Sequence, residues 1–458
     1  MWRCLLMKNK KTLLIILGLV LVLVVSVFLN RSPQLDSVNP LPTAEGDELK
    51  QNEVSTGNSD EILADVNSSL VKGYGDLAFI SKDFLYMIDG TTGEIKQLTE
   101  SGQAIYPRWS YDGNYLAFIR ITDAKSNSGT LWICRRDGKE AYQVQGLPGP
   151  IGAGDFQWSP TEHLLAVGSW NLTDGIWLVP VNEKPQQLVE TGNSKWFAWS
   201  PDGKQIAYSV IEDSETMGDV LYTIAIEDGK IEKRLDLSSS GTGIEVAKWW
   251  PDGKGLLYWA NAAHSSSIRA DGLSLWSLNL DDGEPKELDD TLTYTEWLDF
   301  SPDGKLVMTS GSGRSLWYWK KLALADVRSG SVEHIKPPEG SVAFEPAFSP
   351  NGKKIAFIAA QEMDEITFQS SQEEWFKSRT LWVSDADGSN AKPIVESKVY
   401  SPQWSKDGNY LFYVQDNALW RVSVDGEKPE MVFRGLTGED TWGFYGHIRY
   451  SDLFDYFK

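Results

Sequence analysis

The sequence predicts an all-β fold, a β-propeller of four-stranded blades, and two kinds of repeated segment support this prediction. The first is a strand, a tight turn and a second strand, as in residues 199–208, Trp-Ser-Pro-Asp-Gly-Lys-Gln-Ile-Ala-Tyr. Ser, Pro and Asp suit successive turn positions, and Gly203 accepts the left-handed conformation that reverses the chain. Ile206 and Tyr208 then alternate at the two-residue period of a strand. Further copies, one of them degraded, begin at Trp109, Trp158, Trp250, Phe300, Phe348 and Trp404.

The second repeated segment is a third strand that opens with an aliphatic–aromatic pair and leads to a short fourth strand. A turn, often Asp-Gly as at Asp228-Gly229, separates these two strands. The pairs are Leu131-Trp132, Ile176-Trp177, Leu221-Tyr222, Leu275-Trp276, Leu381-Trp382 and Leu419-Trp420. Leu316-Trp317 fits less well, because that strand could equally begin near Leu322. Four strands in a unit of about 40–50 residues are typical of one propeller blade.

An eighth pair, Leu85-Tyr86, predicts a first blade that has no Trp-Ser-Pro-Asp-Gly strand of its own. The apolar segment 442–448 is left over after the last unit. We expect it to supply the missing inner strand, so that the two ends of the ring pair and no edge stays exposed. The prediction is therefore eight blades, with seven as the alternative, in a ring closed by its N- and C-terminal strands.

The repeated Trp-Ser-Pro-Asp-Gly-Lys turn resembles that of the TolB-like, WD40-like propeller repeat family. The resemblance covers residues 74–450, and it implies a scaffold in complexes of the cell envelope. The chain does not show the separate N-terminal α/β domain of TolB itself, so the role in the Tol system does not follow from the resemblance. The fold alone serves many functions.

The N-terminal segment predicts a membrane anchor. Residues 1–11 are a short basic segment, and residues 12–30 are apolar and just long enough to span a bilayer as a helix. Because the positive charges precede the apolar run, the N-terminus is expected in the cytoplasm and the propeller outside it. The alternative is a cleaved signal peptide, which would leave the propeller periplasmic or secreted. Met7 is an alternative start.

Residues 31–73 are acidic, contain no aromatic residue before Tyr74, and predict a disordered tether. The propeller then occupies 74–450, and residues 451–458 are predicted as a C-terminal tail. The formal net charge of −21 argues against nucleic-acid binding, which needs a basic surface. It also argues against contact of the propeller with an anionic membrane, so membrane contact is assigned to the N-terminal helix only. Cys4 and Cys134 would lie on opposite sides of the membrane, which excludes a disulfide between them.

Long connections between second and third strands are the expected binding region, since long loops on a rigid scaffold commonly bind ligands. The longest is 361–379, which carries Met363, Phe368, Trp375 and Phe376 among acidic residues. Segment 261–272 adds His264 and Arg269. These six residues form the predicted binding face. The alternative is that the aromatic side chains pack the loop onto its own blade.

No catalytic constellation is evident in the sequence. The four histidines fall in different units without metal-ligand spacing, and there is no Gly-x-Ser-x-Gly segment. We therefore predict no enzyme, no cofactor and no metal, but a membrane-anchored propeller that binds an envelope protein, a peptide or a cell-wall polysaccharide. The alternative is an exported carbohydrate-active enzyme, in which Glu or Asp side chains meet at the propeller axis as acid and base. A sensor that signals through a partner is a third hypothesis.

Overall fold

The structure is a computed structural model, which describes residues 66–123, 128–168, 175–190, 196–210, 219–262, 266–436 and 447–457. The chain divides into two compact units, Met1–Gly57 and Asn58–Lys458, and the described residues all belong to the second. The predicted basic segment, the apolar segment 12–30 and most of the predicted tether lie outside the described residues. In the part of the chain that is described, no helix combines the length and the apolar character needed to cross a membrane.

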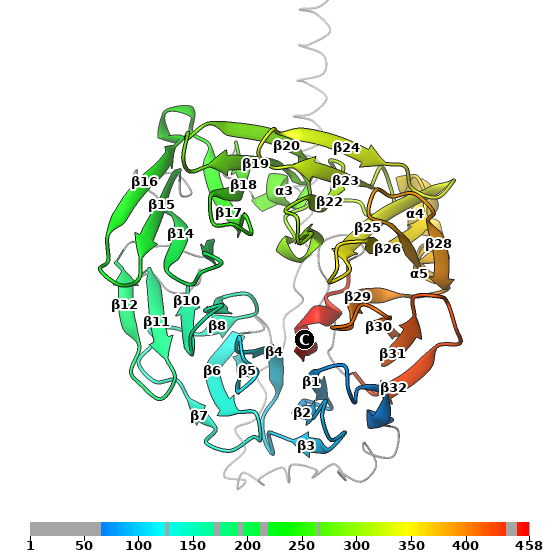
Figure 1. The fold of residues 1–458 in the computed structure, drawn as a ribbon, viewed down its shortest axis with the longest axis horizontal. Coiled ribbons are helices and arrows are strands. Elements are labelled where there is room, and N and C mark those ends of the chain that lie inside the picture. Colours follow the sequence, from blue (N-terminus) through cyan, green and yellow to red (C-terminus); the bar gives the residue numbers. More distant parts are fainter. Residues whose placement is uncertain are drawn as a thin grey trace, which may run out of the picture. The chain divides into compact units, whose positions relative to one another are not determined.

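Antiparallel strands succeed one another in groups of four around a central opening (Figure 1). The first groups comprise β1 (Asp76–Ser81), β2 (Phe84–Ile88) and β3 (Ile95–Gln97); β4 (Ala104–Trp109), β5 (Tyr115–Asp123), β6 (Ser128–Arg135) and β7 (Tyr142–Gln143); β9 (Phe156–Trp158), β10 (Leu164–Val167), β11 (Ile176–Pro180) and β12 (Gln186–Val189); and β13 (Phe197–Trp199), β14 (Gln205–Val210), β15 (Val220–Ala225) and β16 (Ile231–Asp236). A short strand, β8 (Ile151–Gly152), pairs with β6.

The later groups comprise β17 (Gly243–Trp249), β18 (Gly255–Asn261), β19 (Leu273–Asn279) and β20 (Pro285–Thr291); β21 (Leu298–Phe300), β22 (Leu306–Ser310), β23 (Lys321–Asp326) and β24 (Ser331–Ile335); β25 (Ser341–Phe348), β26 (Lys354–Gln361), β27 (Thr380–Asp385) and β28 (Lys392–Val395); and β29 (Tyr400–Trp404), β30 (Tyr410–Gln415), β31 (Ala418–Ser423) and β32 (Glu430–Arg434). A single residue pair, Thr291 with Ser310, joins β20 to β22 and merges two groups into one sheet. The all-β prediction is confirmed. The third strand after Leu316-Trp317 begins at Lys321, beside the predicted alternative start.

The first group is completed by β33 (Phe454–Phe457), which pairs antiparallel with β1. The predicted partner, segment 442–448, lies mostly outside the described residues, and 451–458 is not a simple tail. Phe454 and Tyr456 alternate into the first hydrophobic core, which explains why this segment forms the strand. Between residue 447 and β33, the chain runs through η4 (Tyr450–Asp452).

The folded unit begins before Tyr74, where the sequence predicted the start of the propeller. Leu70, the last residue of η1 (Ser68–Leu70), and Val71 after it are buried in the first core, and the Leu70 carbonyl accepts a hydrogen bond from Arg421 Nη1 at 3.0 Å. Residues from 66 onward therefore belong to the folded unit rather than to the tether.

The repeated turn forms for the reasons that its composition suggested. Ser200 Oγ donates to Asp202 Oδ1 at 2.7 Å and accepts from the backbone N–H of Gln205 at 2.9 Å. Gly203 has φ 69°, the left-handed region that glycine adopts without strain. The same Ser–Asp or Ser–Asn contact recurs at Ser110, Ser349 and Ser405.

In the groups whose inner strand ends in a tryptophan, this residue ties the strand to the inner strand before it, whereas β21 and β25 end in Phe300 and Phe348. In the copy that was predicted to begin at Trp250, the residue in this position is Trp249. The indole N–H of the tryptophan donates to the carbonyl of the residue that precedes the repeat tryptophan or phenylalanine in the neighbouring group. The bonds are Trp158 to Arg108 at 2.9 Å, Trp199 to Gln157 at 3.2 Å, Trp249 to Ala198 at 2.9 Å and Trp404 to Ala347 at 3.0 Å. Trp109 donates in the same way to Asp455 in β33, at 3.3 Å. The C-terminal strand thus takes the place of an inner strand.

Three short helices lie in the connections between second and third strands. They are α3 (Ser266–Ala270), α4 (Glu365–Ser370) and α5 (Gln372–Ser378). Figure 1 shows α4 and α5 beside the group of β25 to β28. These connections and the inner strands supply the side chains of the candidate sites.

The pairing of β33 with β1 yields a stability prediction. We expect Phe454→Ala to lower the free energy of unfolding by about 3–5 kcal/mol, because it removes a fully buried ring from the first core. Urea unfolding followed by tryptophan fluorescence measures this change. Ile231→Ala is the control, since this side chain on β16 is 52% exposed and should cost little. An unchanged midpoint for Phe454→Ala would contradict the role of β33.

Candidate binding site at the ring axis

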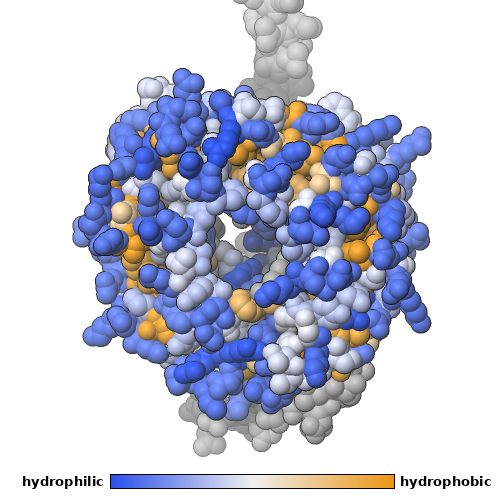
Figure 2. Space-filling model, viewed as in Figure 1, coloured by the Kyte–Doolittle hydropathy of each residue, from blue (hydrophilic) through white to orange (hydrophobic). Residues whose placement is uncertain are grey.

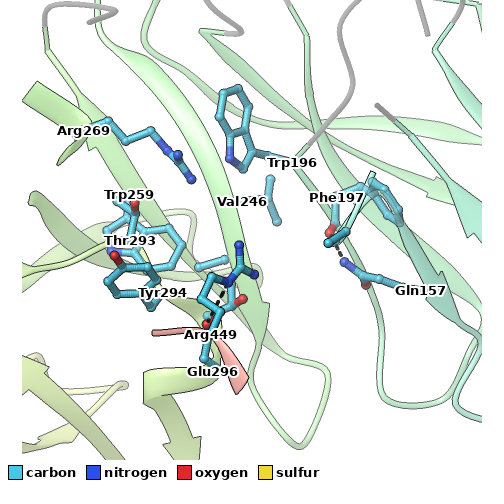
Figure 3. A pocket seen from close by; sticks show the side chains of 14 residues that line it. Gln157, Trp196, Phe197, Val246, Trp259, Arg269, Thr293, Tyr294, Glu296 and Arg449 are labelled. Atoms are coloured by element: carbon cyan, nitrogen blue, oxygen red, sulfur yellow. Dashed lines mark hydrogen bonds and ion pairs between the residues drawn. The ribbon is translucent and has the colours of Figure 1, made fainter. Parts of the chain in front are cut away.

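A cavity of about 300 Å³ lies where inner strands of three neighbouring groups meet the connections around them. Figure 2 shows a central hollow with a mainly hydrophilic border on the face in view. The cavity is walled by the aromatic side chains Trp196, Phe197, Trp259 and Tyr294 and carries the charged side chains Arg269, Glu296 and Arg449 (Figure 3). A second cavity of about 250 Å³ shares Glu296 and is bordered by Glu345 and His447.

In several groups, the residue at one particular position of the repeat lines one of these cavities. The third residue before the repeat aromatic lines one cavity or the other in several groups, as Trp196, Val246, Trp297, Glu345 and Ser401 do. In β25 the register shifts at this position, and Glu345 has φ 55°. Bulges of this kind turn a side chain out of the regular alternation. The position three residues before the repeat aromatic could therefore have been used to predict axial residues from the sequence.

Arg269 is held in the first cavity by a buried carboxylate. Its Nε donates to Glu245 Oε2 at 2.8 Å, and Glu245 also accepts from Asn261 at 3.2 Å. The guanidinium lies 5.6 Å from the centre of the Trp196 ring. Figure 3 shows Arg269, Trp196 and Arg449 around one space. An arginine oriented in this way can bind a carboxylate through its remaining N–H groups.

Arg449 comes from the C-terminal segment and lies between two carboxylates. Its Nε is 3.9 Å from Glu296 Oε1 and 3.8 Å from Asp452 Oδ2. Burial alone would lower the pKa of Arg449, but the two carboxylates outweigh burial and raise it. Burial raises the pKa of Asp452, against the opposing effect of Arg449 and Arg108.

His447 lies between two glutamates where the second cavity meets the segment that leads to β33. Its Nδ1 is 3.6 Å from Glu345 Oε1, and its Nε2 is 3.8 Å from Glu296 Oε1. Glu345 also accepts from Arg379 Nη2 at 2.8 Å and from the backbone N–H of Ser401 at 2.9 Å. Burial would lower the pKa of His447, but the two carboxylates raise it above its ordinary value.

The pKa values of the glutamates shift in the complementary direction. Desolvation would raise the pKa of Glu296, but His447 and Arg449 lower it to about 2. The pKa of Glu345 is likewise lowered, because Arg379 and His447 outweigh its burial. The axis therefore holds two ionised glutamates beside a histidine that retains its proton above the usual pH.

Comparison with known proteins finds no matching protein-family profile but several related proteins. The chain is 26% identical over 266 residues to an uncharacterised protein of Agrobacterium fabrum, which covers 55% of this chain and 83% of that protein. It is 37% identical over 70 residues to the Tol-Pal system protein TolB of Hydrogenovibrio crunogenus, which covers 14% of this chain and 16% of TolB.

The repeats are TolB-like. The local match to TolB agrees with the strand groups and with the turn described above, which confirms the resemblance recognised in the sequence. A further match, at 30% identity over 162 residues, is to the uncharacterised peptidase YuxL of Bacillus subtilis. It covers 35% of this chain and only 21% of the peptidase, so the chain matches about a fifth of that protein.

The match to a peptidase corrects one prediction. The prediction that this TolB-like chain is not an enzyme is wrong as stated, because its relatives include a protein named as a peptidase. The sequence argument relied on the lack of a local catalytic motif. Such a search does not detect residues that only the ring brings together, as His447, Glu296 and Glu345 are brought together at the axis.

The predicted binding face is only partly located at a cavity. Met363, Phe368 and Trp375 are buried, and Phe376 is half-buried beside them, so these four side chains pack α4 and α5 onto their own group and onto neighbouring groups. The Phe368 ring stacks on Trp317, with ring centres 3.4 Å apart. This packing corrects the expectation that these side chains form an exposed face. His264 lies outside the described residues, whereas Arg269 lines the axial cavity.

Two further described histidines each contact an aspartate. His163 contacts Asp112 at 2.8 Å, and His334 contacts Asp289 at 2.6 Å. Within the described ranges, no group of three or more His, Cys, Asp or Glu side chains is arranged to hold a metal ion. Cys134 is buried, and burial raises the pKa of its thiol to about 12.

The axial cluster yields a pH prediction. Because the folded state raises the pKa of His447 above about 6.5, its charge stabilises the fold fully below that pH, and this contribution is lost as the pH rises through the folded-state pKa. We expect the stability difference between the natural protein and His447→Gln to shrink from pH 5.5 to pH 8. Urea unfolding at each pH measures it.

The variant Glu296→Gln tests whether this carboxylate causes the raised pKa of His447. In that background, replacing His447 should change the pH dependence less, because one of the two carboxylates that raise its pKa is gone. An equal pH dependence in both backgrounds would contradict the proposed coupling.

Proposed function

We propose that the chain is an extracytoplasmic TolB-like propeller, tethered to a membrane by its N-terminal segment, whose axial cavity binds a carboxylate-bearing peptide or glycan of the cell envelope. The described four-stranded groups would form eight blades, and β33 would close the ring as the inner strand of the first. The basic and apolar N-terminal residues support the tether. The local match to a Tol-Pal system protein supports the envelope setting.

The observation that carries the proposal is the charge of the first cavity. The chain as a whole has 64 acidic and 43 basic residues, yet the lining of this cavity carries two arginines, Arg269 and Arg449, and one glutamate. The further carboxylates that pair with these arginines, Glu245 and Asp452, are buried and do not line the cavity, so the surface that a ligand meets favours an anionic group. Trp196, Trp259 and Tyr294 add aromatic surface for a sugar ring or an apolar side chain.

A second candidate function is chemical conversion of the bound ligand, and the histidine between two glutamates favours it. Glu296 and Glu345 have lowered pKa values and His447 a raised one, so the axis holds bases and an acid within 4 Å. General acid–base catalysis of glycoside or peptide cleavage uses groups of these kinds. Glu296 borders both cavities and would therefore face a ligand in either.

A binding experiment tests the main proposal. Acidic oligosaccharides, muramyl peptides and acidic peptides are titrated into the purified chain by calorimetry, with neutral analogues beside them. We expect a carboxylate-bearing ligand to bind and Arg269→Gln to weaken it by about 10- to 150-fold, since hydrogen bonds to charged groups contribute roughly 1.5–3 kcal/mol. Higher salt should weaken the natural protein more than the variant.

Arg234→Gln is the matched control, because this arginine lies on β16 and contacts Glu232 and Thr223 rather than the axis. Equal loss in both variants, or equal affinity for neutral analogues, would contradict an anion-selective axial site. The same ligands are analysed for cleavage products after incubation. Cleavage that is abolished by Glu296→Gln while binding persists would support the second candidate function.

A further inference from the structure

Exposed large hydrophobic side chains gather on the connections of three neighbouring groups. Six such side chains are exposed among the described residues, and four of them lie between a second and a third strand. These four are Ile268, Tyr318, Trp319 and Ile366. Trp319 is 68% exposed and Ile366 is 85% exposed. Isolated exposed hydrophobics are ordinary, but a group of them on one set of loops marks an interaction surface.

Tyr318, Trp319 and Ile366 lie on adjoining loops, which we call the aromatic ridge. The loop before β23 contacts the start of the α4 connection twice: the Met363 N–H donates to the Trp317 carbonyl at 2.8 Å, and the Trp319 N–H donates to Glu362 Oε1 at 3.1 Å. Beneath them, the buried Trp317 ring stacks on Phe368. The buried aromatic residues of 361–379 therefore form the base on which the aromatic ridge stands.

The Trp319 backbone is held in a conformation that a bulky residue rarely adopts. Its φ is 54°, in the left-handed region, where a tryptophan is strained. The following residue, Lys320, is 2% exposed, and its ammonium donates to the carbonyls of Ser312 and Tyr318 at 2.9 and 3.3 Å. The Lys320 carbonyl in turn accepts from Ala343 at 3.0 Å. The loop thus presents the Trp319 ring to solvent from a fixed backbone, which lowers the entropy cost of binding.

The charge beside the aromatic ridge indicates the partner. Between residues 362 and 378, five acidic side chains are exposed, and Lys377 is the basic residue of that stretch, paired with Glu373 at 2.7 Å. The acidic residues are Glu362, Asp364, Glu365, Glu373 and Glu374. Such a surface repels anionic lipid and attracts a cationic partner.

We propose that the aromatic ridge docks a basic amphipathic segment of a partner protein, with apolar residues on Trp319 and Ile366 and lysines or arginines over the acidic side chains of 362–374. This surface is separate from the axial cavity, and it takes a ligand of opposite charge. Exposed tryptophans on rigid supports commonly provide the main anchors of protein interfaces.

The test uses the full chain in phosphatidylcholine nanodiscs and a fluorescent synthetic helix with leucines on one face and lysines on the other. We expect binding, and at least about a tenfold weaker affinity for Trp319→Gly and for Ile366→Ala. Glycine suits the left-handed backbone of residue 319, so the first variant keeps the loop. Ile231→Ala, exposed on β16, is the control. A scrambled helix and a glutamate-for-lysine helix should bind at least about tenfold more weakly.

Hydrogen exchange locates the helix on the protein. Protection of 316–321 and 362–370 by the helix supports the proposal, and binding that both ridge variants leave unchanged overturns it. Protection of the same segments by phosphatidylglycerol nanodiscs without the helix would overturn it in favour of lipid. Self-association in sedimentation velocity that is lost in Trp319→Gly would overturn it in favour of a second copy. Arg269→Gln should not change helix binding, so failure of this proposal is distinguishable from failure of the axial one.

Discussion

The hydrogen bond from the repeat tryptophan to the carbonyl of the preceding inner strand is the contact on which the ring arrangement depends. Neighbouring groups also meet through hydrophobic side chains and through other polar contacts, such as those of the Phe348 N–H with Asp299 and of Lys248 with the Leu298 carbonyl. The indole bond adds a direction, because its donor and acceptor occupy equivalent positions in successive groups. Where it is present, this bond therefore fixes the position of one inner strand relative to the next.

The same inner strands carry the axial side chains, so the indole bonds also set the geometry of the candidate site. Trp404 donates to Ala347, two residues after Glu345, and Trp158 donates to Arg108, whose guanidinium reaches the Ser451 carbonyl at 3.0 Å. The charged groups at the axis come from distant parts of the sequence: Glu345 lies on β25 and Glu296 on η3 (Thr295–Trp297), whereas His447 and Arg449 lie in the segment that leads to β33. An arrangement of this kind can hold ionised side chains in place before a ligand arrives.

The turns could be predicted from the sequence because the hydrogen bonds that form them join residues close together in the chain. The turn follows from Ser200, Asp202 and Gly203, which lie within four residues of one another. The partner strand of β1 was predicted in 442–448 but is β33, because Phe454 and Tyr456 reveal their role only when β1 lies beside them. The aromatic residues of 361–379 were predicted as part of a binding face, but their burial depends on contacts such as that of Phe368 with Trp317 in the preceding group. Arg269 was predicted as a site residue from its loop, whereas Glu296, Glu345 and His447 come together only in the folded chain.

The position of β33 affects the order of events during synthesis. The first sheet lacks its inner strand until residue 457 has been made, although β1 to β3 emerge from the ribosome hundreds of residues earlier. During that time β1 presents an unpaired edge, and the acceptor of the Trp109 indole does not yet exist. Translation that stops before residue 447 would leave a chain that lacks β33 as well as His447 and Arg449 of the axial cluster. Such a product would expose β1 to proteases and chaperones.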